Sequence, residues 1–147
     1  MNGAFADTIL ELERAHLTRL AGWGVASAIA GAVLLLLVWR RRSSMPMPFH
    51  FSLQTMLWGF IELALAGGGL RALALRDHAA AVSLDRMLWF TVGLNAGFAM
   101  AGVTLVMAGW RMGRRLSLVG AGVGVVVQGV GLAVLDLMLA GQLGPLL

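Results

Sequence analysis

Four long apolar stretches constrain the fold of this chain more than any other feature of its sequence. They cover residues 17–39, 49–70, 87–110 and 116–140. A transmembrane α-helix needs about 20 predominantly apolar residues, and each stretch is long enough to provide one. The sequence therefore predicts an all-α, polytopic membrane protein with four transmembrane helices.

The composition argues against an ordinary water-soluble domain. Hydrophobic residues make up 59% of the 147 residues and charged residues only 12%, whereas soluble proteins carry about 25% charged residues. Cysteine is absent, which excludes disulfides, thiolate metal sites and a cysteine nucleophile. We therefore expect the lipid bilayer to be the main surroundings of the folded chain.

The positive charge follows the ends of the apolar stretches. All eleven basic residues are arginines, and the formal net charge is +4. Arginines beside apolar segments are typical of membrane-flanking loops, so the charge does not indicate nucleic-acid binding. Six of them lie in the joins at 40–48 and 111–115, against five on the opposite side. By the positive-inside rule, these joins are predicted to face the cytoplasm, with both termini on the non-cytoplasmic side of a bacterial inner membrane.

The short joins predict an up-down-up-down antiparallel bundle that forms a single domain over the whole chain. Pro46 and Pro48 prevent a continuous helix through the first join. The second join, at 71–86, is longer, and the third is the tight segment 111–115.

The first helix is predicted to begin before the first apolar stretch. Thr8 and Glu11 have the spacing of a capping box, in which a hydroxyl and a carboxylate satisfy the free amides of a helix start. Residues 1–16 are therefore predicted to form an interfacial extension of the first transmembrane helix. The alternative is a solvated lead-in turn.

Glu62 lies near the centre of the stretch at 49–70. A charged group at mid-bilayer costs from about 2.5 to 3.5 kcal/mol upward, so such a residue is paired, neutralised or functional. Counting roughly 1.5 Å per residue from the predicted helix ends puts Asn95 at a similar depth and Gln128 close to the midplane. The sequence therefore predicts an intramembrane polar cluster of Glu62, Asn95 and Gln128.

Asp136 lies nearer the end of the last apolar stretch. At that depth Arg14, Arg19 or Arg71 can reach it, and we predict an interfacial ion pair between Asp136 and Arg71. For all these polar groups three roles stay open. They are hydrogen bonding between helices, proton or cation handling, and contact with a partner subunit or a lipid headgroup.

Glycines four residues apart predict close helix packing. The pairs are Gly93 with Gly97 and Gly120 with Gly124. Without side chains, the backbones of two membrane helices can approach closely and gain van der Waals contact. The pattern indicates tight packing, either within the bundle or against another subunit.

The sequence carries no arrangement typical of catalysis or metal binding. His16, His50 and His78 do not have the HxxxH or HExxH spacing. No Ser-His-Asp arrangement or pair of catalytic carboxylates can be argued, because the acids are mainly peripheral. His50 has the position of an axial ligand for a haem or chlorophyll, but an interfacial hydrogen-bonding role is favoured. The sequence therefore predicts no enzymatic activity, no metal and no cofactor.

Several segments resemble a known family, among them LTRLAGWGVASAIAG, FHFSLQTMLWGFIELALAG, GLNAGFAMAG and GVVVQGVGLAVLDLML. They are similar to a bacterial family of small four-helix membrane proteins that carries a domain of unknown function. The resemblance covers about residues 9–140 and implies the four-helix membrane fold, with no activity. In the family pattern an amide often stands at the position of Glu62 and an aspartate at that of Asn95. This departure argues against a motif-based catalytic role for Glu62.

Two classes of function follow from these observations. The first is a non-catalytic small subunit or scaffold that packs against other subunits of a larger membrane complex, such as an energy-transducing respiratory or photosynthetic complex. The alternative is a small proton-coupled transporter or channel that works as a homo-oligomer through Glu62. The absence of catalytic patterns and the glycine pairs favour the subunit.

Overall fold

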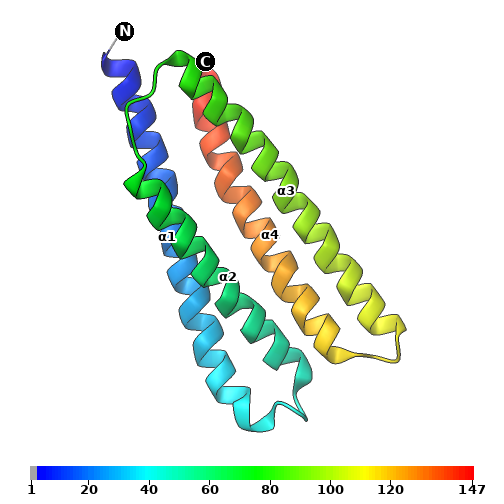
Figure 1. Ribbon diagram of the computed structural model, residues 1–147. Helices are drawn as coiled ribbons and strands as arrows, with labels where there is room; N and C mark the ends of the chain where they lie inside the picture. Colours follow the sequence, from blue (N-terminus) through cyan, green and yellow to red (C-terminus); the bar gives the residue numbers. More distant parts are fainter. Residues whose placement is uncertain (1–2) are drawn as a thin grey trace.

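The computed structural model describes residues 3–147 and confirms the all-α fold with four long helices. The helices run antiparallel to their neighbours in the chain (Figure 1). Their bounds are α1 Gly3–Val38, α2 Pro46–Arg71, α3 His78–Arg111 and α4 Leu116–Leu143, with short 3₁₀ turns at Trp39–Arg41 and Gly144–Leu146. All four helices are long and apolar enough to cross a membrane.

The bundle is built from two helical hairpins. α1 packs along α2, and α3 packs along α4. The hairpins join mainly through α4, which also contacts α2 and, less extensively, α1 (Figure 1). Between α2 and α3 the contact is by side chains, where the Trp58 and Phe98 rings meet edge to face with centroids 5.3 Å apart. α4 is therefore the central helix, and α3 is the most peripheral one.

α2 is the shortest helix and ends before the other three reach the terminal end of the bundle. Its last turn packs on α1, where a Cβ on Gly69 would stand 2.6 Å from Leu17 Cδ2. The linker formed by residues 72–77 then climbs along the bundle to the start of α3 (Figure 1). At this end the bundle therefore consists of α1, α3 and α4. Their core is the cluster of buried residues Ile9, Ala81, Leu84, Leu88, Leu139, Ala140 and Leu143.

α3 begins nine residues before the predicted start at residue 87, at His78. The Asp77 side chain accepts a hydrogen bond from the Ala80 amide at 2.8 Å and caps the helix. Asp85 and Arg86 interrupt the apolar stretch but do not interrupt the helix, because Ala81, Leu84 and Leu88 form a buried face across this segment. The prediction was based on the length of the apolar stretch. That length indicates the lipid-facing part of a helix, and a helix can begin outside it.

α1 also begins earlier than the predicted capping box. Thr8 lies inside the helix, and its hydroxyl donates to the Ala4 carbonyl at 2.8 Å, so the prediction that Thr8 caps the helix is wrong. The first turns are an uninterrupted part of α1, and Ile9 is fully buried against α3 and α4. In the predicted 1–16 extension, the described residues therefore pack within the bundle. Residues 1 and 2 lie outside the described part of the chain.

The remaining turns follow the expected chemistry. Pro46 stands in the first turn of α2, where the missing amide proton costs no hydrogen bond. α3 leads into α4 through a tight turn in which Gly113 has φ of +75°, a conformation that glycine adopts without strain. The Arg115 amide then donates to the Gly109 carbonyl at 2.7 Å and closes the turn.

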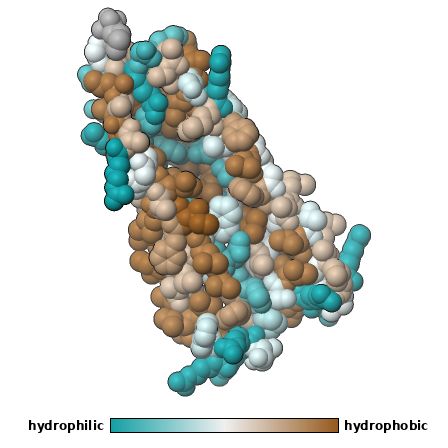
Figure 2. All heavy atoms as spheres, viewed as in Figure 1, coloured by the Kyte–Doolittle hydropathy of each residue, from teal (hydrophilic) through white to brown (hydrophobic). Residues whose placement is uncertain are grey.

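The outer surface of the bundle is strongly apolar. Large hydrophobic side chains are exposed on all four helices, among them Leu36, Leu37, Leu65, Phe90 and Met100. In Figure 2 hydrophobic side chains form broad areas, while hydrophilic ones gather toward the two ends and along a strip between two hydrophobic flanks. Such a surface is the reverse of that of a soluble bundle and is compatible with an integral membrane protein.

Candidate functional site: two buried polar centres

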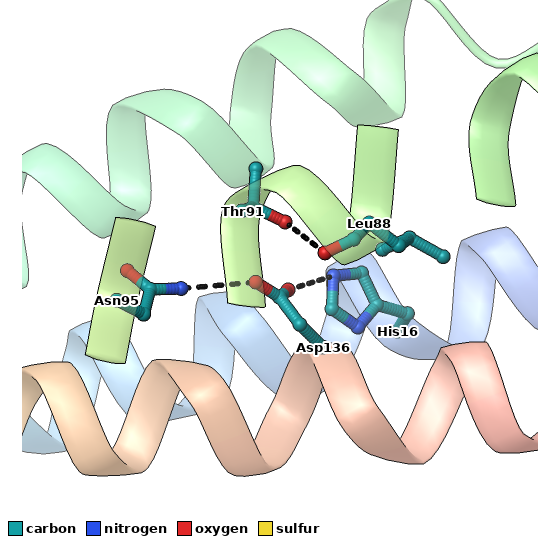
Figure 3. Close-up of polar contacts among 5 residues, drawn as sticks. All are labelled: His16, Leu88, Thr91, Asn95 and Asp136. Carbon is teal, nitrogen blue, oxygen red and sulfur yellow. Dashed lines mark hydrogen bonds and ion pairs between the residues drawn. The ribbon is translucent and has the colours of Figure 1, made fainter. Parts of the chain in front are cut away.

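The first polar centre joins three helices around Asp136 of α4 (Figure 3). Asn95 of α3 donates from Nδ2 to Asp136 Oδ2 at 2.9 Å. On the other side, His16 Nε2 of α1 lies 3.5 Å from Asp136 Oδ1. Nearby, the Thr91 hydroxyl donates to the Leu88 carbonyl at 2.9 Å within α3. We call His16, Asn95 and Asp136 the Asp136 clamp, because they link α1, α3 and α4 at one level.

A second ion pair lies one turn of α1 farther toward the terminal end. Arg76 of the 72–77 linker donates to both carboxylate oxygens of Glu13, from Nε at 2.7 Å and from Nη2 at 2.6 Å. The hydrogen bonds to Glu13 raise the pKa of the Arg76 guanidinium above its ordinary value. A bidentate pair of this kind is both directional and strong. It fastens the linker to α1 beside the Asp136 clamp.

The second polar centre lies deeper in the bundle, around Gln128 of α4. Trp23 of α1 donates from its indole N–H to Gln128 Oε1 at 2.7 Å. Gln128 Nε2 in turn donates to the Ser27 hydroxyl at 3.1 Å. A Cβ on Gly131 would stand 2.6 Å from the Trp23 ring, so this glycine makes room for the indole. Gln128 is fully buried and joins α4 to one face of α1.

Glu62 of α2 belongs to the same centre but differs from its neighbours. Its side chain is fully buried, and neither carboxyl oxygen has a hydrogen-bond partner among residues 3–147. Trp23 lies beside it, but the indole N–H is directed at Gln128. A Cβ on Gly24 of α1 would stand 3.1 Å from Glu62 Cβ. The carboxyl group is therefore enclosed where the α1 and α2 backbones approach each other closely.

An apolar layer separates the two centres. Leu20, Ala66 and Leu132 form a buried cluster contributed by α1, α2 and α4. On each helix the layer lies one turn from the second centre, toward the terminal end. Polar groups on its two sides are therefore in separate surroundings.

The predicted cluster of Glu62, Asn95 and Gln128 is divided between these centres. Glu62 and Gln128 both lie beside Trp23, whereas Asn95 binds Asp136 beyond the apolar layer. The depth count placed the start of the third helix level with the end of the second. Because the 72–77 linker climbs along the bundle, Asn95 lies about two helical turns farther toward the terminal end than that count implied.

The predicted pair of Asp136 with Arg71 is wrong. Asp136 contacts His16 and Asn95, while Arg71 is exposed at the end of α2. Because α2 stops short, this arginine does not enter the space between α1, α3 and α4. His16, Glu13 and Trp23 were not predicted as site residues. Their signal was the spacing of Ile9, Glu13, His16, Leu20 and Gly24, which puts the polar pair on the same helix face as the apolar ones.

The predicted glycine pairs behave differently from each other. A Cβ on Gly120 would overlap the Met47 carbonyl, and one on Gly124 would stand 2.9 Å from Gln54 Cβ, so both glycines pack α4 against α2. Gly93 and Gly97 of α3 are exposed, and a Cβ on either would have no atom within 4 Å. Within the described chain, this second pair makes no close helix contact.

The chemistry available at these centres is that of hydrogen bonding and proton exchange. Within residues 3–147, no group of three or more His, Cys, Asp or Glu side chains has an arrangement that could hold a metal ion. His50 stacks edge to face on Phe49, with ring centroids 5.3 Å apart. The two carboxylic acids, His16 and the hydroxyls of the centres can accept or donate protons.

Comparison with known proteins places the chain in a family. The family of unknown function DUF6992 matches residues 19–137. The chain belongs to this family. Among curated proteins and solved structures, none matches it. The DUF6992 match covers the second polar centre, Asn95 and Asp136 of the Asp136 clamp, and the glycine pairs, whereas Glu13 and His16 precede it.

Proposed function

We propose that this DUF6992 protein is a non-catalytic subunit of a larger membrane complex, and that it binds its partner through the outer face of α3. The observation that carries the proposal is the open pair Gly93 and Gly97, spaced as in close helix–helix contacts yet unused within the bundle. Glycine in a helix costs about 1 kcal/mol relative to alanine. An exposed glycine pair therefore lowers the stability of the helix, and contact with a second helix would offset that loss.

The burial of the four helices supports the same face. In the most apolar 18-residue window of each helix, 39% of α4 is buried within the bundle but only 11% of α3. Small residues Ala96 and Ala101 are exposed beside Gly93 and Gly97 on this helix. Between the exposed side chains of Phe90 and Met100, this face therefore permits close approach of another apolar helix at Gly93 and Gly97, which is how membrane helices gain packing energy in lipid.

For the cellular setting, we propose a bacterial inner membrane with both termini on the non-cytoplasmic side. The arginines at 40–42 and in the segment 111–115 support this orientation. The partner that we propose is a larger energy-transducing complex of that membrane.

The test is purification of the chain at its native expression level in a mild detergent, followed by mass spectrometry of the intact assembly. The proposal predicts a complex that contains other membrane subunits in fixed stoichiometry. A lone monomer, or a homodimer without other subunits, would contradict it.

A second candidate function is proton-coupled transport by a homo-oligomer. The observation in its favour is the fully buried carboxyl group of Glu62, which has no hydrogen-bond partner within residues 3–147. Ionisable groups inside membrane proteins often mark proton or ion pathways. In liposomes with an imposed pH gradient, the wild type is expected to carry a proton flux that Glu62→Gln abolishes. Absence of flux in the wild type, or equal flux in the variant, would dispose of this candidate.

A further inference from the structure

The buried face of α2 is polar along most of its length. Its buried residues are Ser52, Thr55, Gly59, Glu62 and Ala66, spaced three and four apart. The first three turns of this face thus carry two hydroxyls, and the carboxyl of Glu62 follows. Glycine, alanine, serine and threonine are all common where membrane helices pack, so the carboxyl group of Glu62 is the member of this face that packing does not require.

Groups from α1 and α4 fill the interval between Thr55 and Glu62. Gly31 of α1 packs on Met56, and a Cβ on Gly59 would overlap the Ala28 backbone, which sets Ser27 near the level of Gly59. Ser27 accepts a hydrogen bond from Gln128, and Gln128 accepts one from Trp23. The Ser52 hydroxyl donates to the Pro48 carbonyl of its own helix, and Thr55 has no partner within residues 3–147. A series of polar side chains therefore occupies successive levels from the α1–α2 turn to Glu62, without a continuous chain of hydrogen bonds. Its members are Ser52, Thr55, Ser27, Gln128 and Trp23.

This series has one group without a partner at each of two points. The Thr55 hydroxyl is buried and makes no hydrogen bond within residues 3–147, and the same is true of both Glu62 oxygens. Leaving a buried polar group unpaired is costly. A hydroxyl is both donor and acceptor, so it can pass a proton on and return to its neutral state.

The far side of Glu62 is closed. The layer of Leu20, Ala66 and Leu132 lies one turn beyond it, toward the terminal end. The charged groups of the neighbouring helices, His16 and Arg19 on α1 and Asp136 on α4, lie on that other side, more than one turn away along their helices. On its own side Glu62 faces Gly24 and Trp23, and neither carries a charge.

The packing at Glu62 also limits what can bind there. At Gly24 even an added methyl group would stand 3.0 Å from the Gly59 carbonyl and 3.1 Å from the Glu62 and Leu63 side chains. Such close backbones exclude an organic cation or a hydrated metal ion between α1 and α2 at this level. A proton is the one cation that needs no space.

We propose that Glu62 is a proton-binding site that exchanges its proton only with the α1–α2 turn end of the bundle, through the hydroxyls of Thr55 and Ser27. A proton taken from water at that end passes from one hydroxyl to the next as these side chains rotate into contact, and its arrival at one Glu62 oxygen forms a neutral carboxylic acid. Release follows the same route in reverse. This inference is independent of the accessory-subunit proposal and requires no transport, since exchange from one side suffices.

The test is infrared spectroscopy of the full chain in lipid vesicles of neutral phospholipid, following the C=O band of protonated carboxyl groups and its shift after transfer to D₂O. The wild type is expected to show this band, and Glu62→Gln is expected to remove it. Thr55→Val keeps the shape of the side chain but removes the hydroxyl. We expect it to slow hydrogen–deuterium exchange at Glu62 about tenfold, which corresponds to roughly 1.4 kcal/mol in the barrier.

The matched control is Thr104→Val on α3, where an exposed threonine bonds only its own helix, at the Met100 carbonyl. This control should exchange as fast as the wild type. If Thr55→Val does not fold, Ser27→Ala removes the next hydroxyl and should give the same slowing. A wild type without the band, a band that survives Glu62→Gln, or exchange in the hydroxyl variant as fast as in the control would overturn the proposal. Proton flux measured on the same vesicles separates this result from the transport candidate, because slow exchange without flux supports the site and rejects transport.

Discussion

The same glycine spacing occurs on α4 and α3 with opposite surroundings. Gly120 and Gly124 lie against α2, where an added side chain would meet the backbone of Met47 or the side chain of Gln54. Gly93 and Gly97 have the spacing of a packing motif but contact nothing within the described chain. The difference shows that glycines four residues apart indicate a helix face suited to close packing, but do not indicate which helix packs there. On α4 the partner is α2 of the same chain, and on α3 we propose a helix of another subunit.

The largest effect is expected at Gly120. The first carbon of a larger side chain would already overlap the Met47 carbonyl, and a backbone atom cannot move aside without separating α2 from α4. Gly120→Leu should therefore lower the free energy of unfolding by about 3 kcal/mol or more. Reversible unfolding in mixed detergent micelles measures the effect. A variant with wild-type stability would show that α2 and α4 do not touch here.

A smaller loss is expected on the inner face of α3. A Cβ on Gly102 would stand 2.7 Å from the Gly122 carbonyl and 2.8 Å from the Val126 amide of α4. Gly102→Ala should cost about 1–3 kcal/mol in the same unfolding assay. If this alanine is tolerated as well as one at Gly97, then the inner and outer faces of α3 do not differ as we describe.

The third prediction concerns the Asp136 clamp, which also lies between α3 and its neighbours inside the bundle. Asn95→Ala removes the amide that donates to Asp136 and with it the side-chain hydrogen bond between α3 and α4 at this carboxylate. We expect a loss of about 1–2 kcal/mol in the free energy of unfolding. Thr104→Ala is the control, since its hydroxyl bonds only within α3. Equal stability of the two variants would mean that the clamp does not hold α3 to α4.

The smallest effect is expected on the outer face. Gly97 has open space around it, so Gly97→Ala should leave the isolated protein unchanged or more stable by up to about 1 kcal/mol, the difference in helix propensity. The same unfolding assay applies. A marked loss of stability in the purified chain would show that Gly97 already packs on something within the bundle.

The fold class could be predicted from the sequence because hydrophobic length is a local property of each segment. The ends of the helices could be predicted less well from the sequence. The start of α3 was missed because Ala81, Leu84 and Leu88 pack on protein, and that burial does not lengthen an apolar stretch. The break before α2 was predicted because the ring of a proline restricts its own backbone, which is a local effect that needs no knowledge of the fold.

The pairing of polar groups could be predicted only in part. The sequence identified Glu62, Asn95 and Gln128 as intramembrane polar groups and Asp136 as an interfacial one. Their partners depend on where α2 ends and on the direction of the 72–77 linker. These are properties of the assembled bundle. Likewise, the sequence could not tell which glycine pair is covered, because the face of a helix that meets a neighbour is decided by the other helices.

The central claim is that the open face of α3 binds another subunit, and one measurement tests it directly. The wild type and the double variant Gly93→Leu, Gly97→Leu are expressed at native level, extracted in mild detergent and compared by mass of the intact assembly. Gly22→Leu is the matched control, because Gly22 on α1 is equally open. We predict a multi-subunit assembly for the wild type and the control, and a folded chain without partners for the double variant. An assembly that survives the double variant, or a wild type without partners, would contradict the account.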